Sequence, residues 1–361
     1  MYRSIADIES RNCWPMTQEV DSVSSSKRST LKIGSWNVCG LQSVLRTDSK
    51  GVKHKQRIDN NVLDNWLHDE EIDIACLQET RCKPEVSWKP PATRCQPPFA
   101  NLFLHHQVHQ SEHKSTTTAQ PTTTKPRAYT TYAHYCTDKP GYSGTMIATR
   151  IPVIKRQRGF PVGYLENEKD QEGRVIALEF AQFHLVNVYA PSTGHKPAER
   201  SLHRSRVWEP ALRKYIARLQ ETNKPVILVG DLNVIPDTQL DVSADMTWMS
   251  GAKDEVRKNH QLLLSQCKLV DSYRHLFPTE RRYSWAIPSK SESRTTKDSK
   301  KNCNTSTSGS RLDFCLVSEN LKPQIASATI HDDRFGSDHF PVSVSVSFFN
   351  NAAADVSEII N

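Results

Sequence analysis

Residues 225–233 read PVILVGDLN, an apolar run followed by a glycine, a carboxylate and a carboxamide. The run predicts a buried β-strand, and Gly230 marks the point where the strand gives way to a loop. Side chains two positions apart on an extended chain point the same way, so Asp231 and Asn233 are able to face one phosphate-sized ligand. Because Gly-Asp-x-Asn also forms ordinary turns, this stretch needs support from the rest of the chain.

That support comes from other strand-like runs that deliver polar side chains of the same kind. They bring Asn37, Glu79, Asp313 and the pair Asp338 and His339. A fold that needed only turns would have no reason to place an acid, an amide or an imidazole at each of these points. The pattern therefore predicts one site built from distant parts of the chain.

The strand-like runs alternate with helical patterns. Strands are expected around 31–38, 73–79, 145–150, 175–180, 184–190, 225–230, 312–318 and 342–348. Apolar stripes at helical spacing cover 58–67 and, more weakly, 256–267, and Pro210 is expected to restart a helix within 197–221. This mixture predicts an α/β protein with stacked layers.

Some stretches hold too few apolar side chains to be ordered by burial. We therefore expect a flexible leader over 1–30, mobile insertions near 105–127 and 289–309, and a tail over 351–361, around one catalytic domain at 31–350. The basic residues of the second insertion suit either a solvated linker or salt-dependent contacts to DNA.

Composition narrows the class of protein. The chain has 361 residues, of which 37% are hydrophobic, and a formal charge of +7 that is compatible with a polyanionic partner without being specific for one. Nine cysteines without CxxC pairs predict reduced thiols in a cytosolic or nuclear protein. The N-terminus lacks an apolar signal segment and nothing approaches a membrane span, so we expect no membrane partner.

The polar set suits metal-assisted hydrolysis of a phosphodiester. Glu79 is the strongest candidate for a metal ligand, since Mg²⁺ usually takes one or two protein carboxylates and fills its shell with water and phosphate oxygens. Asp231 is suited to orient or deprotonate the attacking water, and Asn37 and Asn233 to hold the water and the phosphate.

Three further side chains have two readings each. His339 is an ordinary surface histidine, or else Asp313 fixes its tautomer so that the other ring nitrogen faces a phosphate oxygen. Tyr189 ends a strand-like run. Its ring packs in the core with the hydroxyl exposed to water, or else its hydroxyl donates a hydrogen bond to the phosphate. Arg81, two residues after Glu79, is either solvated or brings positive charge to the site.

Seven segments resemble, in order, those of the exonuclease III type of apurinic/apyrimidinic (AP) endonuclease. They lie at 31–40, 74–83, 170–176, 226–233, 271–275, 309–314 and 336–341. The resemblance implies a four-layer α/β sandwich, with two packed mixed β-sheets flanked by helices. It also implies a hydrolase of base excision repair that needs Mg²⁺, for which Mn²⁺ can substitute. Such an enzyme cleaves DNA 5′ to abasic sites and processes blocked 3′ ends as a 3′-phosphodiesterase and 3′–5′ exonuclease.

By motif position the resemblance assigns roles to individual residues. Asn37, Tyr189, Asp231, Asn233, Asp313 and His339 would form the catalytic set, Glu79 and Asp338 would hold the metal, and Arg81, Arg174, Trp285 and Leu312 would bind substrate. It further implies a monomer that acts on duplex DNA with abasic sites or damaged 3′ ends. The expected location is the nucleus, with a cytoplasmic or mitochondrial pool.

Three positions depart from the family pattern. Cys39 stands where Asp or Asn is usual, and a thiol is a poor ligand for Mg²⁺. Ser192 replaces an Asn that contacts phosphate, and Ser310 replaces a large aromatic of the sugar pocket, of which Trp285 keeps one wall. The sequence around Ser310 is closer to the second eukaryotic subgroup, in which 3′-end processing is more prominent. We therefore expect intact phosphodiesterase machinery with a looser abasic pocket.

Other functions compete with this one. A retroelement-type DNA endonuclease uses a similar set of strand ends, although it normally precedes a reverse transcriptase in a longer polyprotein. A catalytically weakened DNA-binding relative is conceivable because of Cys39 and Ser192. A phosphatase or sphingomyelinase of the same superfamily is disfavoured by the runs at 170–174 and 271–275.

Overall fold

The computed structural model describes residues 28–45, 62–83, 129–165, 171–194, 198–287 and 308–349. Nearly all of these belong to a unit that spans Thr30–Phe348. The leader, both insertions and the tail expected from the sequence lie outside the described residues, apart from 28–30, 308 and 309.

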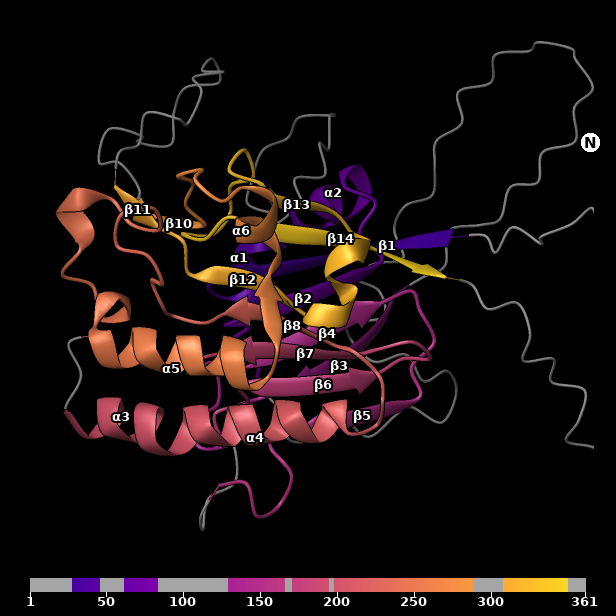
Figure 1. Ribbon diagram of the computed structural model, residues 1–361, viewed down its shortest axis with the longest axis horizontal. Coiled ribbons are helices and arrows are strands. Elements are labelled where there is room, and N and C mark those ends of the chain that lie inside the picture. Colours follow the sequence, from indigo (N-terminus) through magenta and orange to yellow (C-terminus); the bar gives the residue numbers. More distant parts are fainter. Residues whose placement is uncertain are drawn as a thin grey trace, which may run out of the picture. The chain divides into compact units, whose positions relative to one another are not determined.

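Two mixed six-stranded sheets lie at the centre of this unit (Figure 1). The first has the order β13-β14-β1-β2-β4-β3, formed by Ile325–Ile330, Val342–Phe349, Arg28–Asn37, Ile74–Gln78, Thr145–Thr149 and Thr130–His134. The second has the order β5-β6-β7-β8-β12-β9, formed by Lys155–Arg158, Val175–Glu179, His184–Tyr189, Val226–Asp231, Asp313–Ser318 and Leu269–Asp271. Among the strand pairings that the structure describes, β1 with β2 and β7 with β8 are parallel.

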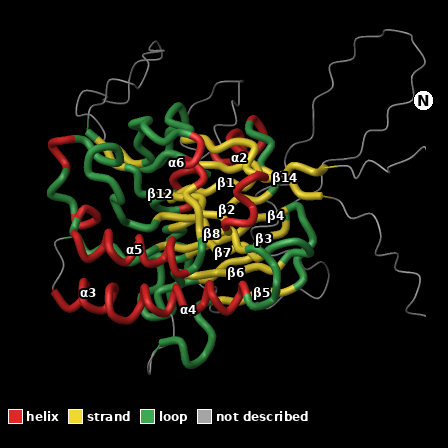
Figure 2. The backbone as a smooth tube through the Cα atoms, in the orientation of Figure 1, coloured by secondary structure: helices red, strands yellow, loops and turns green. Residues whose placement is uncertain are grey.

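Helices cover the outer faces of the sheets, as Figure 2 shows for α4 and α5 beside the second sheet. The α-helices are α1 (Leu41–Val44), α2 (Val62–Asp69), α3 (Ala198–His203), α4 (Glu209–Gln220), α5 (Asp254–Gln266) and α6 (Ser272–Leu276). Short 3₁₀-helices span Ala244–Met246, Ser250–Ala252 and Glu319–Gln324, and a small hairpin pairs β10 (Trp285–Ala286) with β11 (Gly309–Ser310). No helix of the described ranges combines the length and apolar character needed to span a bilayer.

The apolar run that ends in Gly230 is buried on both faces. Ile227 and Val229 of β8 pack in the cluster between the two sheets, whereas Val226 and Leu228 pack against the helical layer. A strand covered on both sides has no polar face, which is why the sequence reads as an unbroken apolar run. The predicted four-layer α/β sandwich is confirmed.

The helix around Pro210 differs in detail from the prediction. An α-helix does begin at Glu209 and carries Pro210 in its first turn, a position at which proline is common. The backbone nevertheless stays helical upstream, because a π-helix (Arg204–Trp208) joins α3 to α4.

Candidate active site

The space between the two sheets changes from apolar to polar toward one end. Alternate residues of a strand face the same side, so the inward-facing residues can be followed along each strand. On four strands these residues change from apolar to polar toward the same end. The inward positions are Ile33, Ser35 and Asn37 on β1, Cys76 and Gln78 on β2, Leu185, Asn187 and Tyr189 on β7, and Ile227, Val229 and Asp231 on β8. The site is therefore the polar end of the inter-sheet core.

Two buried amides form the floor of this site. Gln78 Nε2 donates to Asn187 Oδ1 at 2.8 Å and to Ser35 Oγ at 2.9 Å. Asn187 Nδ2 in turn donates to the carbonyls of Leu77 at 3.0 Å and Met146 at 2.9 Å. These bonds tie β7 of the second sheet to β2 and β4 of the first, directly beneath the residues expected to act.

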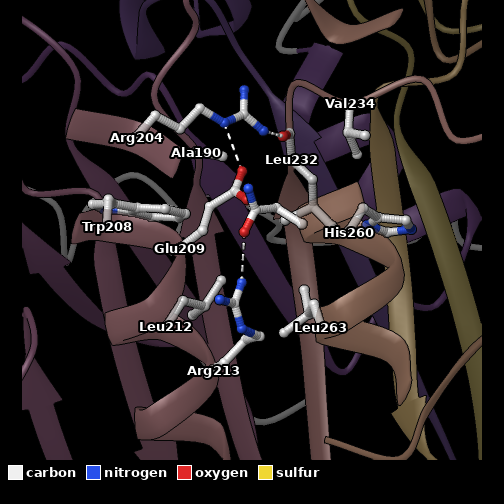
Figure 3. A pocket seen from close by; sticks show the side chains of 11 residues that line it. Ala190, Arg204, Trp208, Glu209, Leu212, Arg213, Leu232, Val234, His260 and Leu263 are labelled. Atoms are coloured by element: carbon white, nitrogen blue, oxygen red, sulfur yellow. Dashed lines mark hydrogen bonds and ion pairs between the residues drawn. The ribbon is translucent and has the colours of Figure 1, made fainter. Parts of the chain in front are cut away.

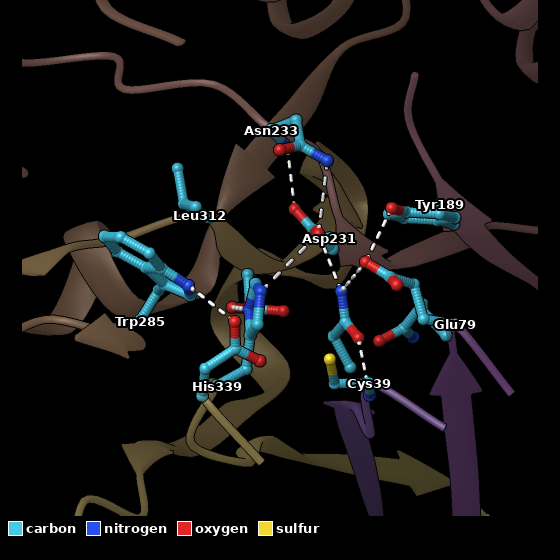
Figure 4. A network of polar contacts seen from close by, with 12 residues as sticks. Cys39, Glu79, Tyr189, Asp231, Asn233, Trp285, Leu312 and His339 are labelled. Carbon is cyan, nitrogen blue, oxygen red and sulfur yellow. Dashed lines mark hydrogen bonds and ion pairs between the residues drawn. The ribbon is translucent and has the colours of Figure 1, made fainter. Parts of the chain in front are cut away.

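Asn37 and Tyr189 connect carboxylates of the two sheets, and Figure 4 shows Tyr189 beside Glu79. Asn37 Nδ2 donates to Asp231 Oδ2 at 3.0 Å and to Glu79 Oε1 at 3.2 Å. The Tyr189 hydroxyl donates to the same Glu79 oxygen at 2.6 Å. Four of the residues predicted from strand ends thus meet in one hydrogen-bonded group.

Two unusual backbone positions lie near the end of β8, one within the strand and one in the turn that follows it. Gly230 has φ of 137°, and a Cβ there would lie 1.9 Å from the Val188 carbonyl oxygen, so only glycine fits. Asn233 has φ of 46°, and its backbone N–H donates to Asp231 Oδ1 at 2.8 Å. Asn233 Nδ2 also donates to Asp231 Oδ2 at 3.2 Å, which places the amide beside the carboxylate as the motif predicted.

Asp313 and His339 form the other side of the site. Asp313 is the register partner of Asp231 on the neighbouring strand, and its Oδ2 lies 2.8 Å from His339 Nδ1. The other ring nitrogen of His339 points toward Asp231, with 3.9 Å between Nε2 and Oδ2. His339 is only 5% exposed, which removes the alternative reading of an ordinary surface histidine.

The charges of these groups follow from their surroundings. Burial lowers the pKa of His339, but the adjacent Asp313 carboxylate outweighs it and raises the pKa to about 10. Burial raises the pKa of Asp231, against the opposing charge of His339. Burial and the charge of Glu79 hold the pKa of Tyr189 well above its usual value. At neutral pH the site therefore combines a histidine cation with a neutral tyrosine donor.

Glu79 is held in its ionised form. Burial would raise its pKa, but hydrogen bonds from Tyr189, Arg81 and Asn37 outweigh that effect and lower it. The pKa of Asp338 is also lowered, since the His339 charge and the Trp285 N–H overcome its burial. Burial, together with the charges of Asp338 and Glu79, raises the pKa of the Cys39 thiol to about 11. The thiol therefore lies within electrostatic reach of both carboxylates.

This donor set fits a hard divalent cation. The described part of the chain contains no group of three or more His, Cys, Asp or Glu side chains arranged to hold a metal ion. A cation at Glu79 and Asp338 would thus take most of its ligands from water and phosphate, which is the habit of Mg²⁺ and not of zinc. The protonated thiol of Cys39 adds no suitable ligand.

The four residues expected to bind substrate differ in access. Arg81 is exposed and pairs with Glu79 at 2.7 Å, so its cation lies at the site. Trp285 is partly buried and donates to Asp338 Oδ2 at 3.1 Å, whereas Leu312 is 4% exposed and packs beside Trp285 in a small apolar cluster.

Arg174 is the most enclosed of these four residues. It is 2% exposed, and its guanidinium donates to Glu172, to the Tyr189 carbonyl and to the Tyr142 hydroxyl. Its guanidinium carbon also lies 4.5 Å from the centre of the Tyr189 ring. These contacts use three of its N–H donors inside the protein and place Arg174 behind the Tyr189 ring, so a role in substrate binding stays a prediction.

Several residues of the site escaped the sequence analysis. Ser284 Oγ donates to Asp313 Oδ2 at 2.7 Å, and Met249 Sδ lies 3.6 Å from the buried hydroxyl of Ser310. Gln78 and Asn187 left a usable signal, since each places an amide at an inward position of an otherwise apolar strand. Ser284 and Met249 lie in loops and leave no such signal.

Comparison with known proteins finds similar sequences that are named as nucleases. The sequence model described as the Endonuclease/Exonuclease/phosphatase family matches residues 34–339. An exodeoxyribonuclease of Bacillus subtilis (strain 168) is 32% identical over 319 residues, 88% of this chain and 99% of the relative. A DNA-(apurinic or apyrimidinic site) endonuclease of Dictyostelium discoideum is 30% identical over 321 residues, 88% and 70% of the two chains. The crystal structure of the AP endonuclease LMAP from Leishmania major matches with a TM-score of 0.63 and 24% identity, covering 88% of each chain.

Proposed function

This chain belongs to the endonuclease/exonuclease/phosphatase family, and we propose that it is a DNA repair nuclease that uses Mg²⁺ to cleave DNA 5′ to abasic sites and to process blocked 3′ ends. The observation that carries the proposal is the position of Asp231. This buried carboxylate is held by Asn37 and Asn233 and faces the cationic His339, beside the ionised Glu79. The relatives of this chain that are named exodeoxyribonuclease and AP endonuclease support DNA as the substrate.

Each group has a task that follows from its charge. Asp231, whose pKa is raised by burial, accepts a proton from the attacking water, while Asn37 and Asn233 orient that water. His339 donates a hydrogen bond through Nε2 to a phosphate oxygen and stabilises the negative charge that develops there. Glu79 and Asp338 would hold Mg²⁺, which would supply Lewis-acid stabilisation of the phosphate and the leaving oxygen.

The experiment is cleavage of a matched set of DNA substrates by the purified chain, with Mg²⁺ or Mn²⁺. Wild type should nick abasic duplex and trim a recessed 3′-phosphoglycolate end, and both Glu79→Ala and Asp231→Asn should abolish this. Nicking that persists unchanged in both variants would trace the activity to a contaminant. Binding without cleavage by wild type would favour the weakened DNA-binding relative.

Ser310 gives the proposal a finer form. Position 310 carries this serine in place of an aromatic side chain. Ser310 is fully buried, and its hydroxyl lies 3.6 Å from Met249 Sδ. We expect 3′-end processing to be strong relative to abasic incision. Much faster incision of abasic duplex than removal of 3′-phosphoglycolate, measured side by side, would contradict this preference. Action as a monomer in the nucleus stays a prediction, which sedimentation and imaging of the full chain would test.

A further inference from the structure

The π-helix before α4 brings two charged residues onto one face. Residues five apart in an α-helix point roughly 140° away from each other. In the π-helix, the N–H of Glu209 instead bonds the carbonyl of Arg204, five residues earlier, and Arg204 Nε donates to Glu209 Oε1 at 2.7 Å. The wider turn therefore creates an ion pair that a regular helix of the same sequence would not allow.

Arg204 uses this position to reach two loops of the active site. Its Nη1 donates to the carbonyls of Pro191 at 2.9 Å and Asn233 at 3.0 Å, and its Nη2 donates to the carbonyl of Leu232 at 2.8 Å. Figure 3 shows the guanidinium between Glu209 and the Leu232 backbone. Four of the five N–H groups that a guanidinium carries are thus accounted for.

These carbonyls belong to the segments that follow the catalytic strand ends. Pro191 comes two residues after Tyr189, and Leu232 and Asn233 directly follow Asp231. The turn at Asn233 has left-handed backbone, so its carbonyls leave the sheet and need partners elsewhere. Arg204 is 2% exposed, and it holds both loops at a fixed distance from the helical layer.

Glu209 makes this buried cation tolerable. Burial raises the pKa of Glu209, and the charge of Arg204 opposes that rise. Its side chain is 11% exposed, and that of Arg204 is 3% exposed, so both charges are largely desolvated. A guanidinium in such surroundings is costly without a partner, which is why losing either member should disturb the loops and not only the helix.

We propose that Arg204 is a positioning residue for catalysis, which sets the distance between the Tyr189 and Asp231 loops, and that Glu209 is its counter-ion. The inference rests on the proposed nuclease function for its kinetic consequence. Its geometric part concerns only the loops and stands apart from the identity of the substrate.

The test compares Arg204→Met with Arg213→Met in the full-length protein. Arg213 lies on α4 and its charge also acts on Glu209, but in the described chain its guanidinium donates to Asn259 Oδ1 at 2.9 Å and to no active-site loop, so it controls for a lost charge without a lost loop contact. At a temperature where circular dichroism shows both variants folded, Arg204→Met should lower kcat on abasic or 3′-blocked DNA about 10- to 100-fold, because small misplacements of reacting groups are costly. KM should change less than about twofold, and Arg213→Met should match wild type.

A second readout separates this inference from the proposed function. Amide hydrogen exchange over residues 231–235 should accelerate in Arg204→Met and stay at the wild-type rate in Arg213→Met. If wild type cleaves no DNA while this exchange still accelerates, the nuclease proposal fails and the positioning geometry holds. If wild type cleaves DNA and folded Arg204→Met keeps the wild-type kcat, the positioning role is wrong.

Conservative variants cover the case in which Arg204→Met does not fold. Arg204→Lys keeps the charge but lacks the planar fork that reaches three carbonyls, so it should restore part of the lost kcat. Glu209→Gln keeps an acceptor for Arg204 Nε and should retain more kcat than Glu209→Leu. Equal kcat values in folded Glu209→Gln and Glu209→Leu would contradict the counter-ion role.

Discussion

His339 Nδ1 lies 2.8 Å from Asp313 Oδ2, and the two residues are 5% and 2% exposed. The pair joins the first residue of β12 to the segment before β14. In these surroundings His339 stays an imidazolium cation at neutral pH, and its Nε2 is directed toward Asp231. The electrophilic half of the site therefore depends on one buried carboxylate.

Asp313→Asn tests that dependence. The amide keeps the shape of the side chain but removes the charge that stabilises the histidine cation, so kcat/KM for DNA cleavage should fall about 10²- to 10⁴-fold. Asp332→Asn is the control, because it changes a carboxylate that pairs with Arg282 away from the site. Similar kcat/KM values for the two variants would show that the Asp313 charge is not needed.

Gly230→Ala tests the close approach of β7 and β8. The new Cβ would lie 1.9 Å from the Val188 carbonyl oxygen at φ of 137°, so we expect a loss of about 4 kcal/mol or more in the free energy of unfolding, or no soluble protein. Gly163→Ala is the matched control, since φ is 85° there and nothing lies within 4 Å of the added carbon. That variant should lose only about 1–2 kcal/mol. Equal losses in urea unfolding would contradict the steric argument.

Arg311→Met tests a buried ion network. Arg311 donates to Asp241 at 2.7 Å and to Asp271 at 2.7 Å while only 2% exposed, so its loss removes the buried cation that the two carboxylates share, and Asp241 keeps only its pair with Arg274. The free energy of unfolding should fall by about 3–5 kcal/mol. Arg218→Met removes an exposed pair with Glu221 and should cost less than about 1 kcal/mol. A loss of that small size in Arg311→Met, measured by urea unfolding, would be evidence against the network.

His260 should make stability depend on pH. Burial lowers its folded-state pKa to about 4, below the value of about 6.5 in the unfolded chain, so the unfolded state takes up a proton first as the pH falls. Above pH about 6.5, His260 does not change the free energy of unfolding. As the pH falls from about 6.5 to 4, proton uptake by the unfolded state progressively lowers the free energy of unfolding. His260→Leu removes this loss and should gain about 2 kcal/mol relative to wild type between pH 7 and pH 5.

The control for this measurement is His68→Gln, which changes an exposed histidine of α2. Its free energy of unfolding should follow the wild-type pH dependence. A constant difference between His260→Leu and wild type across pH 7 to 5 would show that burial does not hold His260 neutral.

The central strands were predictable because burial on both faces leaves continuous apolar runs. All eight expected strands appear within a few residues of their predicted limits. The edge strand β5 was missed because it reads Lys-Arg-Gln-Arg, with no apolar alternation, and charged side chains are common on exposed edges. The strands β3 and β13 were missed as well, since partly exposed residues alternate weakly along both.

The site was predictable to a similar depth. Strand-end chemistry identified Asn37, Glu79, Asp231 and His339, and the structure brings them together. Strand-end chemistry did not identify Arg204, because nothing in the local sequence distinguishes one arginine of a helical segment from the next. The contact of Arg174 with the back of Tyr189 was not foreseen either, since motif position does not tell what else a guanidinium touches.

Apolar periodicity and the chemistry of strand ends are local properties, so residue order alone was enough to specify which elements form and which side chains leave the core at their ends. Charge state and reach are not local. A cationic His339 requires Asp313 beside it in a buried space, and the contacts of Arg204 with two loops require a π-turn packed against them. Folding alone brings these groups to hydrogen-bond distance and desolvates them, and both the distance and the loss of solvent set the strength of their interaction.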